Sequence, residues 1–595
     1  MKKLWGFNLA LTLLVLSCSP APRHTLTNNE KSADLAWVYS KFQENYAPLE
    51  YKQARYGFDF ETLKKQYDEK ALQTRTNEEF YSVLYKFVSE FKDAHTSGIL
   101  SESYLPGRTF VGFLGFHGAR KGDNYVITEL FPSVQRFANR FPLKVGDVIT
   151  KLDGVSLKEI ALTTQVQTRD LGQNESNLTY HMDRIFNRYS LNGTLPTTSD
   201  AQLTVLRNEK EEMVQLSWVV KDLLVFLKEQ REASQALFNN KTEKKTVYEL
   251  ALLNLTNEFP LQPFFAKKFL PQSKDYRFWN SFEFIDYSPI GLAKLLRNQK
   301  QGGWYPWENF RNDRNVPANA LILSQSEAYP TYVTLEKVLN KDGTPAGQIK
   351  PVAYMYLDTF SPWFGDDAVV AEVKTTLNTL KANGVKDLVI DLINNGGGSL
   401  LLGIELAQLF SNQPLTLPQM QFALNETWLD DFENWSTNWP FDPEQVTIKK
   451  IYESLLEDRN SGKRLSKPWS TRFFMPASFT PNTDIEGKLN IVLLVNEMCA
   501  SMCDIFTAML KDNELVKVVG TKTMGAGGNV TTHFEAPNSH FSVNQTESLL
   551  LRKDGSYIEN NGVEPDVAVA VNESVVEKYS PVRDKAVELL VKQQD

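Results

Sequence analysis

The C-terminal part of the chain alternates buried strands with amphipathic helices, and this alternation limits the folds open to it. A strand, "GQIKPVAYMYLDTF", precedes a helical stretch, "DDAVVAEVKTTLNTLKANG", which ends at Gly384 as a helix C-cap does. A second strand, "VKDLVIDLINNGGG", a second helix, "LLLGIELAQLF", and a third strand, "KLNIVLLV", follow. Strands joined by helices form parallel or mixed sheets covered by helices. We therefore expect an α/β core at residues 346–595, interrupted at 412–484 by an insertion rich in Trp and Phe.

The chain has 595 residues, which is too many for one hydrophobic core. Residues 31–107 carry apolar side chains at helical spacing and predict a helical N-terminal domain, with Thr76 and Glu79 as a capping box. Residues 108–222 alternate apolar and polar side chains, and "LKVGDVITKLDGVSL" resembles a PDZ domain, which binds an extended chain end at a sheet edge. Residues 223–345 are rich in aromatic side chains, and their fold stays unassigned. The fold class predicted is therefore multidomain α+β.

The first residues have the layout of an export signal. The basic "MKK" precedes the apolar "LWGFNLALTLLVL", which is too short to span a bilayer comfortably. "VLSC" resembles a bacterial lipobox, which implies cleavage before Cys18 and lipidation of its thiol. The alternative is an ordinary signal peptide with an incidental cysteine. We expect a signal at residues 1–18, a tether at 19–30, and an exported protein, secreted or in the bacterial cell envelope, that meets a membrane only through its lipid anchor.

Charge and cysteine content exclude several classes of function. The net charge is −8 and no basic block is present, so a nucleic-acid partner is not expected. Of the three cysteines, Cys499 and Cys503 lie four residues apart, without a disulfide framework or the spacing of a zinc site. We expect both to be buried free thiols. Neither a metal nor an organic cofactor is implied.

A serine lies between these two cysteines, on the predicted turn from a strand to a helix. A serine on such a turn is a candidate nucleophile, so "VNEMCASMCDIF" makes Ser501 the first candidate for catalysis. The glycines of "DLINNGGG" follow another buried strand and permit backbone N–H groups to face a ligand, as in an oxyanion hole. The segment "GSYIENNGVEPDVAV" then leads into the last predicted strand.

Taken in order, the motifs at residues 391–398, 496–504, 520–527 and 562–566 resemble those of the tail-specific, or C-terminal-processing, serine proteases. This resemblance implies a protease core of ββα-spiral-like, mixed-sheet architecture. It also implies that Ser501 is the nucleophile in hydrolysis of peptide bonds in protein or peptide substrates.

The general base departs from the pattern of many members. They have a lysine where this chain has Ala526, and alanine cannot accept a proton. A branch that resembles the tricorn core protease uses histidine instead. That resemblance implies His95 as the base and Glu559 as the group that orients it. It also implies the backbone N–H groups of Gly397 and Met502 as the oxyanion hole.

Several alternatives stay open. Lys522, His533 or His540 could be the base, and Glu564 competes with Glu559. The histidine-type pattern has a serine before its histidine, whereas this chain has Ala94.

At the level of function, loss of the lysine could mark a catalytically inactive relative that acts as a peptide- or ligand-binding scaffold. A nucleophilic cysteine, at 499 or 503, is a third possibility, although a reactive thiolate needs a nearby cation or helix N-terminus.

Overall fold

The computed structural model describes most of the chain between residues 24 and 592. The described residues are 24–100, 110–135, 139–163, 169–190, 194–222, 225, 226, 229, 314–324, 329–361, 366–438, 445–475, 479–484 and 489–592. The predicted signal, with Cys18, and most of the unassigned stretch 223–345 lie outside them. Within the described residues, no helix is both long and apolar enough to cross a membrane.

Four helices open the described chain, as the helical spacing predicts. They are α1 (Asn28–Asn45), α2 (Leu49–Tyr56), α3 (Phe60–Leu72) and α4 (Asn77–Ser89). The capping box predicted at the start of α4 is confirmed, because the Thr76 side chain accepts from Glu79 N and the Glu79 side chain accepts from Thr76 N.

The helices share their core with a distant part of the chain. After α4, strand β1 (Ser97–Leu100) pairs antiparallel with β20 (Phe541–Thr546), which also pairs with β19 (Val530–His533). Phe541 and Val543 of β20 are buried in the same apolar cluster as the four helices. The N-terminal helices therefore do not form a core of their own.

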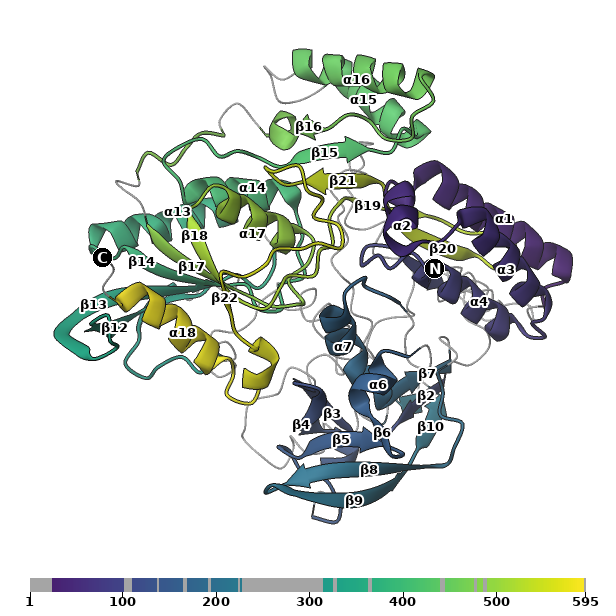
Figure 1. The fold of residues 1–595 in the computed structure, drawn as a ribbon, viewed down its shortest axis with the longest axis horizontal. Coiled ribbons are helices and arrows are strands. Elements are labelled where there is room, and N and C mark those ends of the chain that lie inside the picture. The colour runs from purple at the N-terminus through teal and green to yellow at the C-terminus, as the bar shows by residue number, and fades with distance from the viewer. Residues whose placement is uncertain are drawn as a thin grey trace, which may run out of the picture.

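A second region is built from strands between residues 110 and 222. One sheet has the order β3-β4-β5-β8-β9, with β6 paired to β5, and a smaller sheet has the order β10-β2-β7. The strands are β2 (Phe110–Phe113), β3 (Phe116–Lys121), β4 (Asn124–Leu130), β5 (Val148–Leu152), β6 (Val155–Ser156), β7 (Asn187–Tyr189), β8 (Asp200–Arg207), β9 (Lys210–Ser217) and β10 (Val219–Asp222). Helices α5 (Pro132–Gln135), α6 (Leu157–Ala161) and α7 (Asn174–Met182) connect them, and α7 lies on the side that faces the rest of the molecule (Figure 1).

The core is a seven-stranded mixed sheet, which confirms the predicted fold class. Its order is β11-β12-β13-β14-β17-β18-β22, in which the first three strands are antiparallel and β13 to β22 are parallel. The strands are β11 (Leu321–Ser324), β12 (Thr331–Leu339), β13 (Pro345–Tyr356), β14 (Asp387–Asp391), β17 (Asn490–Val495), β18 (Val516–Gly520) and β22 (Val567–Ala568).

The core sheet begins earlier in the chain than residue 346, where the sequence pattern predicts it. Strands β11 and β12 belong to the stretch whose fold the sequence leaves unassigned. Both lie at the antiparallel edge, where Leu321, Leu335 and Ile349 are exposed. Because apolar and polar side chains do not sort cleanly between a buried and a wet face there, the alternation that reveals a strand is weak.

Helices cover both faces of this sheet. Alternate residues of each strand point to opposite faces, so Ala353 packs in the cluster of α13 (Asp366–Ala382), α14 (Leu400–Leu409) and α17 (Met502–Asp512). Val352 packs instead against α18 (Ser580–Val591). The predicted insertion holds β15 (Gln419–Phe422), α15 (Glu426–Asn438), α16 (Gln445–Asn460) and β16 (Trp469–Ser470), and β15 pairs with β21 (Ser548–Leu551) outside the seven-stranded sheet.

Candidate active site

Ser501 lies on a tight turn between β17 and α17. It caps the N-terminus of α17 with φ 57° and ψ −122°, and it is 8% exposed. A positive φ is uncommon for a residue other than glycine and marks a strained backbone that its surroundings must hold. Asn496, at the start of the turn, accepts a hydrogen bond from Asn394 N (2.8 Å) and donates to the Asn394 side chain (2.7 Å). The turn is thereby joined to the end of the neighbouring strand β14.

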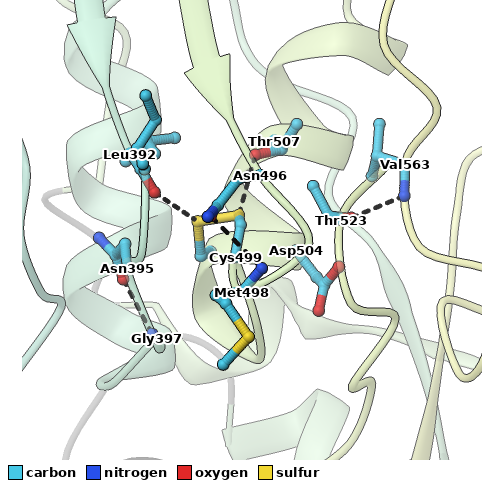
Figure 2. Close-up of a disulfide and its surroundings, with 12 residues drawn as sticks. Leu392, Asn395, Gly397, Asn496, Met498, Cys499, Asp504, Thr507, Thr523 and Val563 are labelled. Atoms are coloured by element: carbon cyan, nitrogen blue, oxygen red, sulfur yellow. Dashed lines mark hydrogen bonds between the residues drawn. A yellow bond between two sulfur atoms is a disulfide. The ribbon is translucent and has the colours of Figure 1, made fainter. Parts of the chain in front are cut away.

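The glycine turn after β14 packs directly against Ser501. Gly397 has φ 102°, and a Cβ there would lie 2.6 Å from Ser501 Cβ and 2.8 Å from Met502 N, so only glycine fits. Gly397 N donates to Asn395 Oδ1 at 2.8 Å, as Figure 2 shows. Met502 is the first residue of α17, and the first N–H groups of a helix have no partner within it. The structure therefore brings together Gly397, Ser501 and Met502, with one of the two predicted N–H donors engaged by Asn395.

The two cysteines form a disulfide, so the prediction of free thiols is wrong. Cys499 and Cys503 are fully buried, as predicted, but their sulfur atoms are bonded and their Cα atoms are 5.3 Å apart (Figure 2). That separation lies within the range that a disulfide spans. Residue spacing does not reveal this bond, because it depends on the positive φ of Ser501 between the two cysteines. In this form neither cysteine is a thiolate.

Asp504 connects α17 to the loop of residues 520–528, which we call the glycine loop. Its carboxylate accepts from Gly525 N and Ala526 N, both at 2.9 Å, and Met524 N donates to Cys499 O at 2.9 Å. Burial raises the pKa of Asp504 to about 7, against the opposing effect of these donors. The methyl group of Ala526 is fully buried.

His95 reaches the same region from the N-terminal helices. Its preceding residue, Ala94, is buried in one small apolar cluster with Ala500 and Ala526, so the His95 segment packs beside the nucleophile turn. His95 N donates to Asp93 Oδ1 at 2.8 Å, whereas the ring Nδ1 has no hydrogen-bond partner among the described residues. Burial lowers the pKa of His95 to about 4, opposed by the charge of Asp93 and assisted by Arg169. The imidazole is therefore neutral at neutral pH.

Glu559 is fully buried, and both of its oxygens are engaged. Gly527 N donates to Oε2 at 3.1 Å, and Lys52 of α2 donates to Oε1. Burial and the charge of Asp93 raise the pKa of Glu559 to about 8, against the opposing effect of Lys52. Three consecutive N–H groups are thus held by carboxyl groups, those of Gly525 and Ala526 by Asp504 and that of Gly527 by Glu559.

The alternative candidates have partners of their own. Lys522 pairs with the exposed Glu564 at 2.9 Å. His533 contacts Glu547 at 2.7 Å. His540 contacts Glu535 at 3.2 Å. Among the described residues, no group of His, Cys, Asp or Glu could hold a metal ion.

Sequence reasoning did not single out two groups that shape this site. Asp504 lies inside the quoted motif around Ser501, but its contact with Gly525 and Ala526 appears only in the folded chain. Lys52 gave no signal, because it lies in "LEYKQARY", a short helix whose charges are typical of a solvated surface.

Three comparisons with known proteins bear on this arrangement. Residues 351–569 match the model of Peptidase family S41. The chain is 24% identical over 646 residues to a protein of Chlamydia trachomatis, with 99% of this chain and 97% of that protein covered. It is also 25% identical over 199 residues to a probable CtpA-like serine protease of Staphylococcus epidermidis, covering 33% of this chain and 30% of that protein.

The fold has a solved counterpart. The crystal structure of mature CPAF superposes with a TM-score of 0.66 at 20% identity, covering 95% of this chain and 98% of that one. The likeness extends beyond the core to the helical and strand-rich regions that precede it. The motifs and the family match identify residues 351–569 as a Peptidase family S41 domain, so the chain carries a serine-type peptidase domain.

Proposed function

We propose that this chain is an exported peptidase of Ser–His–Glu type that cleaves protein or peptide substrates. Ser501 is its nucleophile and His95 its general base. Glu559 orients the imidazole and stabilises its protonated form. The observation that carries the proposal is the packing at one turn: Gly397 lies against Ser501 and Met502, and Ala94, next to His95, packs with Ala500.

The proposed reaction begins with a neutral imidazole. The low pKa of His95 leaves it unprotonated at neutral pH, so it can accept the Ser501 proton as the hydroxyl attacks the substrate carbonyl. The imidazolium that forms is buried, and an isolated buried charge is costly. A carboxylate at Glu559, which is the main form above its pKa of about 8, offsets that cost, as an acid does in triads of this type.

The oxyanion of the tetrahedral intermediate would bind at the backbone. Met502 N–H lies at the start of α17, where the helix dipole also favours negative charge. Gly397 N–H is the second donor, and it becomes available once the Asn395 side chain, which accepts from it here, turns away. Removing one donor of an oxyanion hole typically costs about 3 kcal/mol in the barrier.

The location and targeting are proposed from the sequence alone. The apolar segment and "VLSC" support export and attachment of a lipid to Cys18, which would tether the peptidase to a membrane of the cell envelope. The PDZ-like region is proposed to hold an extended substrate end, as sheet-edge binding does in other proteins.

Ser501→Ala tests the function directly. The variant keeps the fold but removes the attacking oxygen, so hydrolysis of unfolded casein should fall to background. The matched control is Ser399→Ala, whose serine caps α14 rather than the nucleophile helix and should leave cleavage measurable. Cleavage by Ser501→Ala at the parent rate would refute the proposal, and parent protein without activity would favour the binding scaffold.

A further inference from the structure

Lys52 is a buried lysine at the centre of the site. It belongs to α2, in the N-terminal helices, yet its side chain has no exposed surface. An ammonium group has three hydrogens to donate. Lys52 Nζ donates to Lys92 O at 2.9 Å, to Asn560 Oδ1 at 2.5 Å and to Glu559 Oε1. All three donors are therefore satisfied.

Burying these two charged groups costs free energy, so a role beyond stability is expected. Burying an ammonium and a carboxylate together removes both from water, and a buried ion pair often contributes little net stability compared with apolar side chains of the same volume. Lys52 and Glu559 are 507 residues apart in the chain, so the contact joins α2 to the segment that follows the glycine loop. If position 52 only filled space, an apolar side chain such as methionine would do so without the cost of removing a charge from water.

From this contact we infer that Lys52 is a positioning residue of the catalytic site: it holds Glu559 as an oriented carboxylate, so that the N-terminal helices complete the site. The inference rests on the proposed function, in which that carboxylate supports His95. It assigns to a helix outside the matched family segment a part in positioning the catalytic groups.

Without the Lys52 ammonium, Glu559 would keep the negative charge of Asp93 nearby and lose the cation that opposes it. The other ionisable groups whose charges act with Glu559 or on His95 come from the C-cap of α1, from α2, from the segment after α4 and from the segment before α7. They are Tyr46, Tyr51, Tyr56, Asp93 and Arg169. Asp93 raises the pKa of Glu559, and Lys52 is the cation that opposes this. Without Lys52, Glu559 would keep its proton to a higher pH.

The test is the pH profile of Ser501 reactivity in the full-length chain. The rate of labelling by a fluorophosphonate is measured between pH 5.5 and pH 10 for the parent, Lys52→Met, Lys52→Gln and Lys52→Arg. The parent rate should rise with pH with a midpoint near the pKa of Glu559, about 8. In Lys52→Met the midpoint should rise by at least one unit, so labelling at pH 7 slows at least about tenfold and recovers towards pH 10.

The other variants separate the effect of the Lys52 charge from the effect of its volume. Lys52→Gln keeps a donor in the same space without the charge, so it should show the same shift and decides the matter if Lys52→Met fails to fold. Lys52→Arg restores a cation and should move the midpoint back towards that of the parent. Lys65→Met removes an exposed lysine of α3 and should leave the profile unchanged.

The outcomes separate this inference from the proposed function. A profile for the folded charge-free variants that superimposes on the parent, or that is lower by the same factor at every pH, would overturn the role of Lys52. Either result leaves the Ser501 proposal standing, because that proposal is tested by the activity of the parent and of Ser501→Ala.

Discussion

Ser501 has a backbone conformation that costs on the order of 1–3 kcal/mol for a residue other than glycine. Its φ of 57° is held by neighbours on every side: Gly397 against its Cβ, the disulfide across it, and Asp504 in the first turn of α17. This conformation places Ser501 Cβ against Gly397 at the N-terminus of a helix. At the scale of single residues, the conformation of Ser501 is therefore set by its immediate neighbours.

His95 makes the folded state sensitive to acid. Its pKa is about 4 when folded, below the ordinary value of 6.5, so the unfolded chain takes up the proton first as pH falls. Stability contributed by the neutral ring is therefore complete above pH 6.5 and is lost between pH 6.5 and about 4. Between pH 7 and pH 4.5 the loss should be about 2 kcal/mol.

This prediction is checked by urea unfolding of the parent and of His95→Asn at the two pH values. Asparagine does not titrate, so the variant should lose about 2 kcal/mol less than the parent over the same interval. Contributions from Glu559 and Asp504 are present in both proteins and cancel to first order in the comparison. An equal loss in both proteins would show that His95 is not buried as a neutral group.

The turn between β17 and α17 is the element on which the site depends. The disulfide closes a loop of only about five residues, for which the loss of chain entropy in the unfolded state is worth about 2 kcal/mol. We predict that replacing both Cys499 and Cys503 by alanine lowers the free energy of unfolding by about that amount. Peptidase activity should fall too, because the Ser501 turn loses a constraint.

Denaturant unfolding with and without dithiothreitol checks this. The reductant should destabilise the parent and leave the double variant unaffected, since the variant has no bond to reduce. If the oxidised parent and the double variant unfold at the same denaturant concentration, the bridge does not stabilise the turn.

The core elements could be predicted from sequence where burial on both faces leaves continuous apolar runs. Strands β14 and β17 are of this kind, as parallel strands covered by helices usually are. Strands β11 and β12 could not, because their outer parts expose apolar side chains at a sheet edge. The disulfide was missed for a related reason: it depends on one residue's backbone conformation, which spacing does not reveal.

In the whole molecule, the site is assembled from parts of the chain that are hundreds of residues apart. Glu497, next to the nucleophile turn, accepts from Thr179 of α7 at 2.6 Å and from Thr521 at 2.7 Å, and Arg120 lies 3.7 Å from it. The strand-rich region therefore contacts the turn through α7, while the N-terminal part of the chain supplies Lys52 of α2 and His95, which follows α4. In Figure 1 the strand-rich region and the N-terminal helices meet the core on different sides.

Because these residues are far apart in the chain, only some of them could be predicted from the sequence. Ser501, Gly397 and Met502 could be named because each lies in a local motif. His95 and Glu559 were reached only through a family resemblance, since no periodicity connects them. The contact between Lys52 and Glu559 had neither kind of signal, and only the folded chain reveals it.

The central claim is that His95 activates Ser501, and one measurement tests it most directly. Parent protein and His95→Ala are reacted with a fluorophosphonate at pH 8.5, and the modified peptide is identified by mass spectrometry. We expect stoichiometric labelling of Ser501 in the parent and a rate at least about 100-fold lower in the variant, within the range of general-base catalysis. Labelling of Ser501 at the same rate in both proteins, or of another residue in the parent, would contradict it.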